Sequence, residues 1–230
     1  MSKNWEKELT QRLKLLYFSA EQNNRMFPEH DLGHARRVKN LCLLINKNDS
    51  LHLDEEILVA AALLHDIGYI ADDNAEHVKS SIQLAQGLLP KIKFPKNKIY
   101  HVIICIKNHD NVPGRSGWKK KVPIECKILR DADAIESLGC LGIIRYATWG
   151  GRHQMPIYNQ SQKLDNKKNL FPQIDLIKNI KIRTAELLTR CHTKTGMKIM
   201  QKRLKIMQKF IYEIEKEINF AEKEVNKNES

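Results

Sequence analysis

The sequence is poor in the residues that interrupt regular structure. Its 230 residues include only ten glycines and seven prolines, and aromatic residues make up 7% of the chain. Runs of β-branched residues are short, while Leu, Ile, Ala, Lys and Glu dominate, a composition that favours helices. A hydrophobic content of 42% is typical of a globular chain and argues against a disordered one.

Signals for export and membrane insertion are also missing. The first residues, MSKNWEKELTQ, are charged and contain no apolar segment of the kind found in a signal peptide. No hydrophobic run approaches the length of a membrane span. The five cysteines (42, 105, 126, 140 and 191) form no C-x-x-C pair, so we expect reduced thiols, most of them buried. These absences predict a cytoplasmic protein with no membrane partner.

Positive charge is concentrated in one part of the chain. The formal net charge is +12, and residues 91–121 contain nine basic residues and one acidic residue. Such a block suggests an anionic partner, which would be the phosphates of a small molecule, a nucleic acid or a membrane surface. A solvated lysine-rich face is the alternative, and the charge pattern alone does not separate the two.

Hydrophobic periodicity predicts helices along the whole chain. Residues 57–70 form the most apolar stretch, predicted to be a buried helix that ends in His65-Asp66 before Gly68 lets the chain turn. The other predicted helices cover residues 4–24, 31–47 with Asp31 as N-cap, 71–89 before Pro90, 96–108, 125–138, 139–149, 173–190 and 196–225. Loops are expected at 111–123 and 150–172. We find no repeat and no convincing strand, so the predicted class is all-α.

Three His-Asp pairs lie at predicted helix boundaries: His30-Asp31, His65-Asp66 and His109-Asp110. His34 lies on the same helical flank as His30, four residues later. Asp131 and Asp133 share a further helix, but they point about 200° apart, so only one of them can face a given site.

Two imidazoles and two carboxylates from separate helices would make a mixed nitrogen and oxygen site. Such a site suits Mn, Fe, Co, Ni or Zn better than Ca. An ion held in this way acidifies bound water and polarises a phosphoryl oxygen, and nearby basic residues would hold the remaining phosphate charge. The donor set and the charge block therefore indicate the same chemistry.

The order His34, then His65-Asp66, then Asp133 resembles the H…HD…D signature of the HD-domain metal-dependent phosphohydrolase superfamily. The segments HDLGHARRV, LLHDIG, EHVKSS, IKNH, DADAIESLG with GIIRYA, and HTKTGMKIMQKR resemble a branch of bacterial single-domain HD hydrolases. That branch includes enzymes that act on nucleoside triphosphates. The resemblance covers roughly residues 25–220 and implies a single-domain HD-type helical bundle. Residues 1–24 would then pack on a metal-binding core of residues 25–150, which residues 151–230 complete.

The resemblance implies that His34, His65, Asp66 and Asp133 bind a divalent metal ion. Mn²⁺ is the preferred ion, with Mg²⁺, Co²⁺, Ni²⁺, Fe²⁺ and Zn²⁺ as candidates. Asp133 is preferred to Asp131 because A-D-A-I-E-S-L resembles the final A-D-x-x-D-A-L pattern of the superfamily. Asp131 is then expected to be a helix cap or a neighbour of the ligands.

Two further histidines, His77 and His109, are expected to assist catalysis together with Asp66. In HD-G-Y-P relatives, similar helices supply a second metal site. Here His109 offers one imidazole where those relatives have two, and Tyr69 stands where they have lysine. We therefore expect one metal ion, with two as the alternative, and His77 and His109 facing either the substrate or the metal ligands.

Arg37, in the H-x-x-R-V pattern, and Arg145, in G-I-I-R, are the candidate substrate-binding residues. Each would either hold phosphate or pair with a glutamate.

The expected function is hydrolysis of a phosphoester or phosphoanhydride bond in a nucleotide or similar small phosphorylated substrate. One alternative is a 5′-nucleotidase-type HD phosphomonoesterase, which would use the same ligands. A basic helical nucleic-acid-binding protein with residues 91–121 as its footprint is less favoured, because no nucleic-acid motif accompanies the lysines. The apolar face of the last helix would cover either its own core or a second copy in a homodimer.

Overall fold

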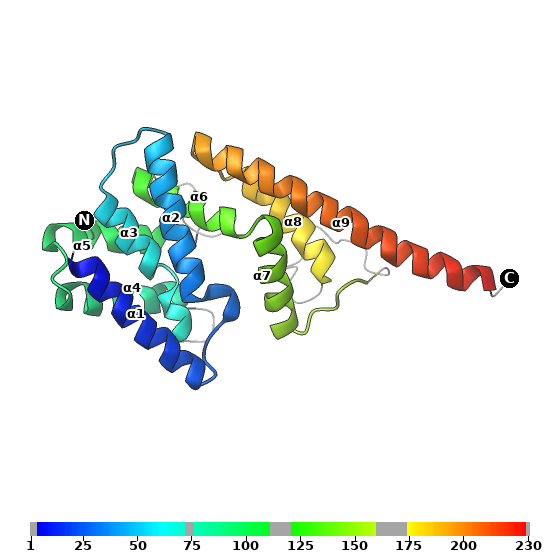
Figure 1. Cartoon of the computed structure of the whole chain (residues 1–230), viewed down its shortest axis with the longest axis horizontal. Helices are drawn as coiled ribbons and strands as arrows, with labels where there is room; N and C mark the ends of the chain where they lie inside the picture. Colours follow the sequence, from blue (N-terminus) through cyan, green and yellow to red (C-terminus); the bar gives the residue numbers. More distant parts are fainter. Residues whose placement is uncertain (1–3, 72–75, 111–120, 160–173, 229–230) are drawn as a thin grey trace. The chain divides into compact units, whose positions relative to one another are not determined.

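Helices account for every regular element in the computed structural model, which describes residues 4–71, 76–110, 121–159 and 174–228 (Figure 1). The elements are α1 (Asn4–Gln22), η1 (Pro28–His30), α2 (Leu32–Asn48), α3 (Glu55–Leu64), η2 (Ile67–Ile70), α4 (His77–Lys91), α5 (Lys96–His109), α6 (Ile124–Glu136), α7 (Gly139–Arg152), α8 (Leu176–Leu188) and α9 (Lys194–Asn228), where η marks a short 3-10 helix. The all-α prediction is confirmed. None of the helices described is long and apolar enough to cross a membrane.

The chain divides into two compact units. The first contains Met1–Glu136 and Cys191–Met197, and the second contains Ser137–Arg190 and Lys198–Ser230. The proposed boundaries at residues 24 and 150, and the inclusion of the C-terminal helices in the same domain, remain predictions.

The core of the first unit is built around α3. Every residue from Glu56 to Leu64 is buried, and α3 packs against α2, α5 and α6. Asp54 caps the N-terminus by accepting a 2.9 Å hydrogen bond from the backbone N–H of Glu56. Burial of each large apolar side chain contributes about 1.5–3 kcal/mol. The helix ends at Leu64 with His65 as its C-cap, so the predicted apolar run ending in a polar pair is confirmed.

Helix α1 covers this core with the face that its periodicity predicts. Trp5, Leu9, Leu13 and Tyr17 are buried. The Trp5 indole N–H donates to Oε1 of Glu56 at 3.2 Å, which attaches the start of α1 to the start of α3.

Gly68 brings the turn after Asp66 into close contact with α4. A Cβ at this position would lie 2.0 Å from the His77 carbonyl oxygen, closer than any side chain permits. The backbone N–H of Gly68 also donates to Oγ of Ser81 at 2.8 Å. These contacts place the first turn of α4, with His77, directly beside the His65-Asp66 pair.

Some predicted boundaries were wrong. Helix α4 continues through Pro90 to Lys91 because a proline in the last turn removes a single hydrogen bond, and the Ile92 N–H still bonds to Leu88 at 3.2 Å. Helix α7 extends to Arg152, into the loop expected from residue 150. Residues 160–172 of that loop, and residues 111–120 of the loop expected at 111–123, lie outside the described residues.

All five cysteines are free thiols, as predicted. Cys42, Cys105 and Cys126 are buried, Cys191 is half-buried and Cys140 is exposed.

Candidate metal centre

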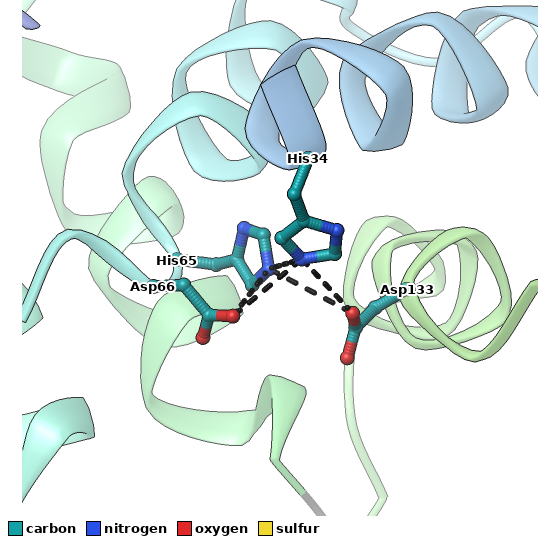
Figure 2. Close-up of side chains that lie close together, drawn as sticks. All are labelled: His34, His65, Asp66 and Asp133. Atoms are coloured by element: carbon teal, nitrogen blue, oxygen red, sulfur yellow. Dashed lines mark hydrogen bonds and ion pairs between the residues drawn. The ribbon is translucent and has the colours of Figure 1, made fainter. Parts of the chain in front are cut away.

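Four side chains from three helical segments meet at one point in the first unit. His34 comes from the first turn of α2, His65 and Asp66 follow α3, and Asp133 projects from α6 (Figure 2). Nε2 of His34 lies 3.3 Å from Nε2 of His65, 3.3 Å from Oδ1 of Asp133 and 3.5 Å from Oδ2 of Asp66. One ligand atom from each of the four residues lies within 4.8 Å of the others. The structure thus brings together all four residues predicted to bind the ion.

The atoms that converge here fit a cation. Nδ1 of His65 lies 2.8 Å from the carbonyl oxygen of Ala62, which only accepts hydrogen bonds, so the proton is assigned to Nδ1 and a lone pair on Nε2 faces the cluster. Burial opposes ionisation of Asp66, but the neighbouring imidazoles of His65 and His30 and a hydrogen bond from His109 hold its pKa well below the ordinary value. Burial also opposes ionisation of Asp133, whereas His34 and His65 lower its pKa. Two imidazole nitrogens and two ionised carboxylates thus converge in one space, with the Asp133 carboxylate at its more exposed side, as suits a divalent ion.

A second layer of charge supports His34. Its Nδ1 lies 3.7 Å from Oε2 of Glu136, and the same oxygen accepts a 2.6 Å hydrogen bond from Nε of Arg37. Burial opposes ionisation of Glu136, but hydrogen bonds from His34 and Arg37 outweigh it and lower the pKa of Glu136 to about 2. A carboxylate behind a metal-binding imidazole fixes the orientation of the ring.

This arrangement bears on both candidate arginines. Arg37 pairs with Glu136, and its side chain keeps 40% exposure, so binding of phosphate by its terminal nitrogens remains a prediction. Arg145 lies on α7 in the second unit, and its contact with substrate also remains a prediction.

His77 and His109 lie on the other side of Asp66. Oδ1 of Asp66 is 3.1 Å from Nε2 of His109 and 3.9 Å from Nε2 of His77. These three residues form a second group with ligand atoms within 4.8 Å of one another, and Asp66 belongs to both groups. The predicted single ion and the alternative of two ions both remain open.

The protonation of His109 follows from its neighbours. Nδ1 lies 2.7 Å from the carbonyl oxygen of Ile106, and Nε2 faces Asp66. Both partners are acceptors, so both ring nitrogens carry protons when no metal is bound. Burial disfavours the charged ring, but the hydrogen bond to Asp66 and the charges of Asp66, Asp110 and Asp133 raise the pKa of His109 to about 9.

Asp131 is directed away from the cluster. Its buried carboxylate accepts hydrogen bonds from the Thr193 N–H at 2.8 Å, the Thr193 hydroxyl at 2.6 Å and the His192 N–H at 3.0 Å. It therefore holds the segment that begins α9, while Asp133 faces His34 and His65. This placement agrees with the capping role expected for Asp131.

Sequence reasoning assigned no role to two residues of the site, His30 and Glu136. Nδ1 of His30 lies 2.6 Å from Oδ2 of Asp66. The position of His30 four residues before His34 was a usable signal. Glu136 lies three residues after Asp133 on α6, and Arg37 lies three residues after His34 on α2. Residues three apart share a helix face, so this spacing could have indicated that Arg37 and Glu136 lie on the faces where α2 and α6 meet.

Comparison with known proteins agrees with this geometry. Residues 31–138 match the family model of the HD domain. In solved structures, Bacillus subtilis YpgQ in complex with ADP is similar, with 21% identity and a TM-score of 0.68 over 93% of this chain and 96% of that one. An HD-superfamily hydrolase from Bacillus thuringiensis has 20% identity and a TM-score of 0.66, over 94% of this chain and 98% of that one.

A curated Clostridium beijerinckii protein is 30% identical over 80 residues, which span 34% of this chain and 51% of that protein, about half its length. Taken with the shared fold and the His and Asp cluster, the family match defines the class. Residues 31–138 form an HD domain.

Proposed function

We propose that this protein is a metal-dependent phosphohydrolase that cleaves a phosphoester or phosphoanhydride bond of a nucleotide or similar small phosphorylated substrate. The observation that carries this proposal is the convergence of buried His34, His65 and Asp66 with half-buried Asp133, whose ligand atoms lie within 4.8 Å of one another. The nucleotide is favoured because the similar Bacillus subtilis YpgQ structure contains ADP. A cytoplasmic location and a homodimer also belong to the proposal and rest on the sequence alone.

His34, His65, Asp66 and Asp133 would hold the ion, with Mn²⁺ preferred for a mixed imidazole and carboxylate set. Such an ion, when bound, acts as a Lewis acid that polarises a phosphoryl oxygen and acidifies water. Oε2 of Glu136 faces Nδ1 of His34 at 3.7 Å, and the carbonyl of Ala62 accepts a hydrogen bond from Nδ1 of His65 at 2.8 Å. The chain therefore presents the ligands in fixed orientations.

The remaining chemistry is assigned to groups around Asp66. Asp66 would orient the attacking water as a hydrogen-bond acceptor. His109 and His77 would move the proton, since both Nε2 atoms face Oδ1 of Asp66 and His77 also lies 3.9 Å from Oδ2 of Asp110. These two imidazoles are buried, so bulk water does not compete for the proton.

Release of phosphate and pyrophosphate from a panel of nucleoside mono- and triphosphates tests the proposal, with Mn²⁺, Mg²⁺, Co²⁺ or EDTA. We expect metal-dependent turnover by the wild type and none by His65→Ala. His52→Asn is the matched control, because His52 is an exposed histidine outside the cluster. Phosphate release from monophosphates alone would indicate the phosphomonoesterase, and full activity of His65→Ala would refute the site.

The number of ions is measured separately by metal analysis of the purified protein. We expect one Mn²⁺ per chain in both the wild type and His109→Ala. Two ions in the wild type and one in His109→Ala would instead assign an ion to Asp66, His77 and His109.

A further inference from the structure

The two oxygens of the Asp66 carboxylate have different surroundings. Oδ2 faces Nε2 of His65 at 3.3 Å and Nε2 of His34 at 3.5 Å, within the group of predicted ligands. Oδ1 faces His109 and His77. A carboxylate on a single side-chain bond can rotate, so some contact must hold the orientation in which Oδ2 faces the ligand imidazoles.

On the Oδ2 side, which faces the ligand imidazoles, His30 makes that contact. Its Nδ1 lies 2.6 Å from Oδ2, the shortest of the distances between Asp66 and the surrounding imidazoles. An ionised carboxylate only accepts hydrogen bonds, so Nδ1 of His30 carries the proton and donates it. His65 differs, because the proton on its Nδ1 is directed to Ala62 and its Nε2 has only a lone pair to offer.

Aromatic stacking fixes the His30 ring. It stacks on Tyr69 with centroids 4.0 Å apart and planes inclined by 22°. The opposite face of Tyr69 stacks on His77 at 4.2 Å and 10°. Tyr69 is itself tied to the Asp66 backbone, because its N–H donates to the Asp66 carbonyl at 3.1 Å. One tyrosine ring therefore sets the places of two imidazoles, and each imidazole faces a different oxygen of Asp66.

We propose that His30 is a positioning residue of the metal centre. Held against Tyr69, it donates from Nδ1 to Oδ2 of Asp66 and fixes the carboxylate in the orientation that binds the ion. The inference rests on the proposed metal site, but it does not depend on the substrate. Hydrogen-bonding partners of ligating carboxylates typically change metal affinity by about 10- to 100-fold when they are removed.

Two substitutions separate the hydrogen bond from the stacking. His30→Phe keeps a ring against Tyr69 and removes the donor, whereas His30→Asn keeps an N–H donor close to the position of Nδ1 and removes the ring. Calorimetric titration of the metal-free proteins with Mn²⁺ should give His30→Phe an affinity weakened about tenfold or more, with His30→Asn recovering most of the loss. The electron paramagnetic resonance spectrum of bound Mn²⁺ should change in His30→Phe and return towards the wild-type form in His30→Asn.

Wild-type affinity in His30→Phe would overturn the proposal. An equal loss in both variants would also overturn it, because it would make His30 a ligand or only a packing residue. Urea unfolding of the metal-free variants checks that the changes in affinity do not simply follow stability. Since the titration uses Mn²⁺ alone, a failure to hydrolyse nucleotides would refute the proposed reaction and leave the assignment of His30 intact.

Discussion

In the absence of divalent ions, the protein should lose stability as the pH rises from 6.5 to 9, because of His109. The surrounding charges raise the pKa of His109 from its ordinary 6.5 to about 9. A raised pKa in the folded state contributes stability that is fully present below pH 6.5 and is lost as the pH rises through 9. The ionisable groups that face this ring are Asp66, Asp110, Asp133 and His77.

The size of the effect follows from the shift. A change from 6.5 to about 9 corresponds to about 3 kcal/mol at 1.36 kcal/mol for each pKa unit. For a chain of this length, such a change moves the melting temperature by about 6 to 12 °C. Burial lowers the pKa of His77, so the stability that His77 contributes is lost as the pH falls below 6.5. The two histidines therefore act in separate pH ranges.

Urea denaturation in EDTA at half-unit steps between pH 6 and 9 measures this loss. His109→Gln should remove most of the slope above pH 6.5, whereas His52→Asn, at an exposed position, should keep it. Excess Mn²⁺ should reverse the trend, since metal ligands bind better when they are deprotonated. A wild-type stability that stays constant from pH 6.5 to 9, or an unchanged slope in His109→Gln, would refute the reasoning.

Two further predictions concern positions beside the site. Gly68→Ala should destabilise the protein by about 2 kcal/mol or more in urea unfolding, because the new Cβ would meet the His77 backbone. Gly87→Ala, on the helix α4 that Gly68 contacts, is the control. A Cβ at Gly87 meets nothing within 4 Å, so stability should hold or rise, and equal losses would disprove the clash. Asp131→Asn should cost about 1 to 3 kcal/mol of stability and keep the Mn²⁺ affinity, whereas Asp133→Asn should lose that affinity in calorimetry. The reverse pattern would make Asp131 the ligand.

Those features of the fold that depend on neighbours along the chain were predictable from the sequence. The apolar run of α3 and its end at His65 follow from hydrophobicity and a polar pair. The predicted N-cap Asp31 accepts a hydrogen bond from the His34 N–H at 2.6 Å. The resemblance to the H…HD…D signature, with the A-D-x-x-D-A-L pattern for Asp133, selected the four residues whose ligand atoms converge. Local pattern therefore predicted the helices, and the family resemblance predicted the ligands.

Contacts across the fold were not predictable in the same way. His30 and Asp66 are 36 residues apart, and Arg37 and Glu136 are 99 apart. Helical periodicity shows that such side chains leave their helices on a given face, but it does not show which partner lies opposite. The pairing of Arg37 with a buried carboxylate, one of its two expected roles, depends on how α2 packs against α6, which only the structure supplies.

Asp131 and Asp133 project from different sides of α6. The Asp131 carboxylate holds the start of α9, and the Asp133 carboxylate faces the predicted ligand imidazoles. The length of α6 is consequently as constrained as its composition. Insertion of a single residue before Asp131 would rotate both carboxylates by about 100° and remove the anchor and the ligand together. Variation in α6 is therefore restricted to substitutions, and changes in chain length must fall in the connections outside it.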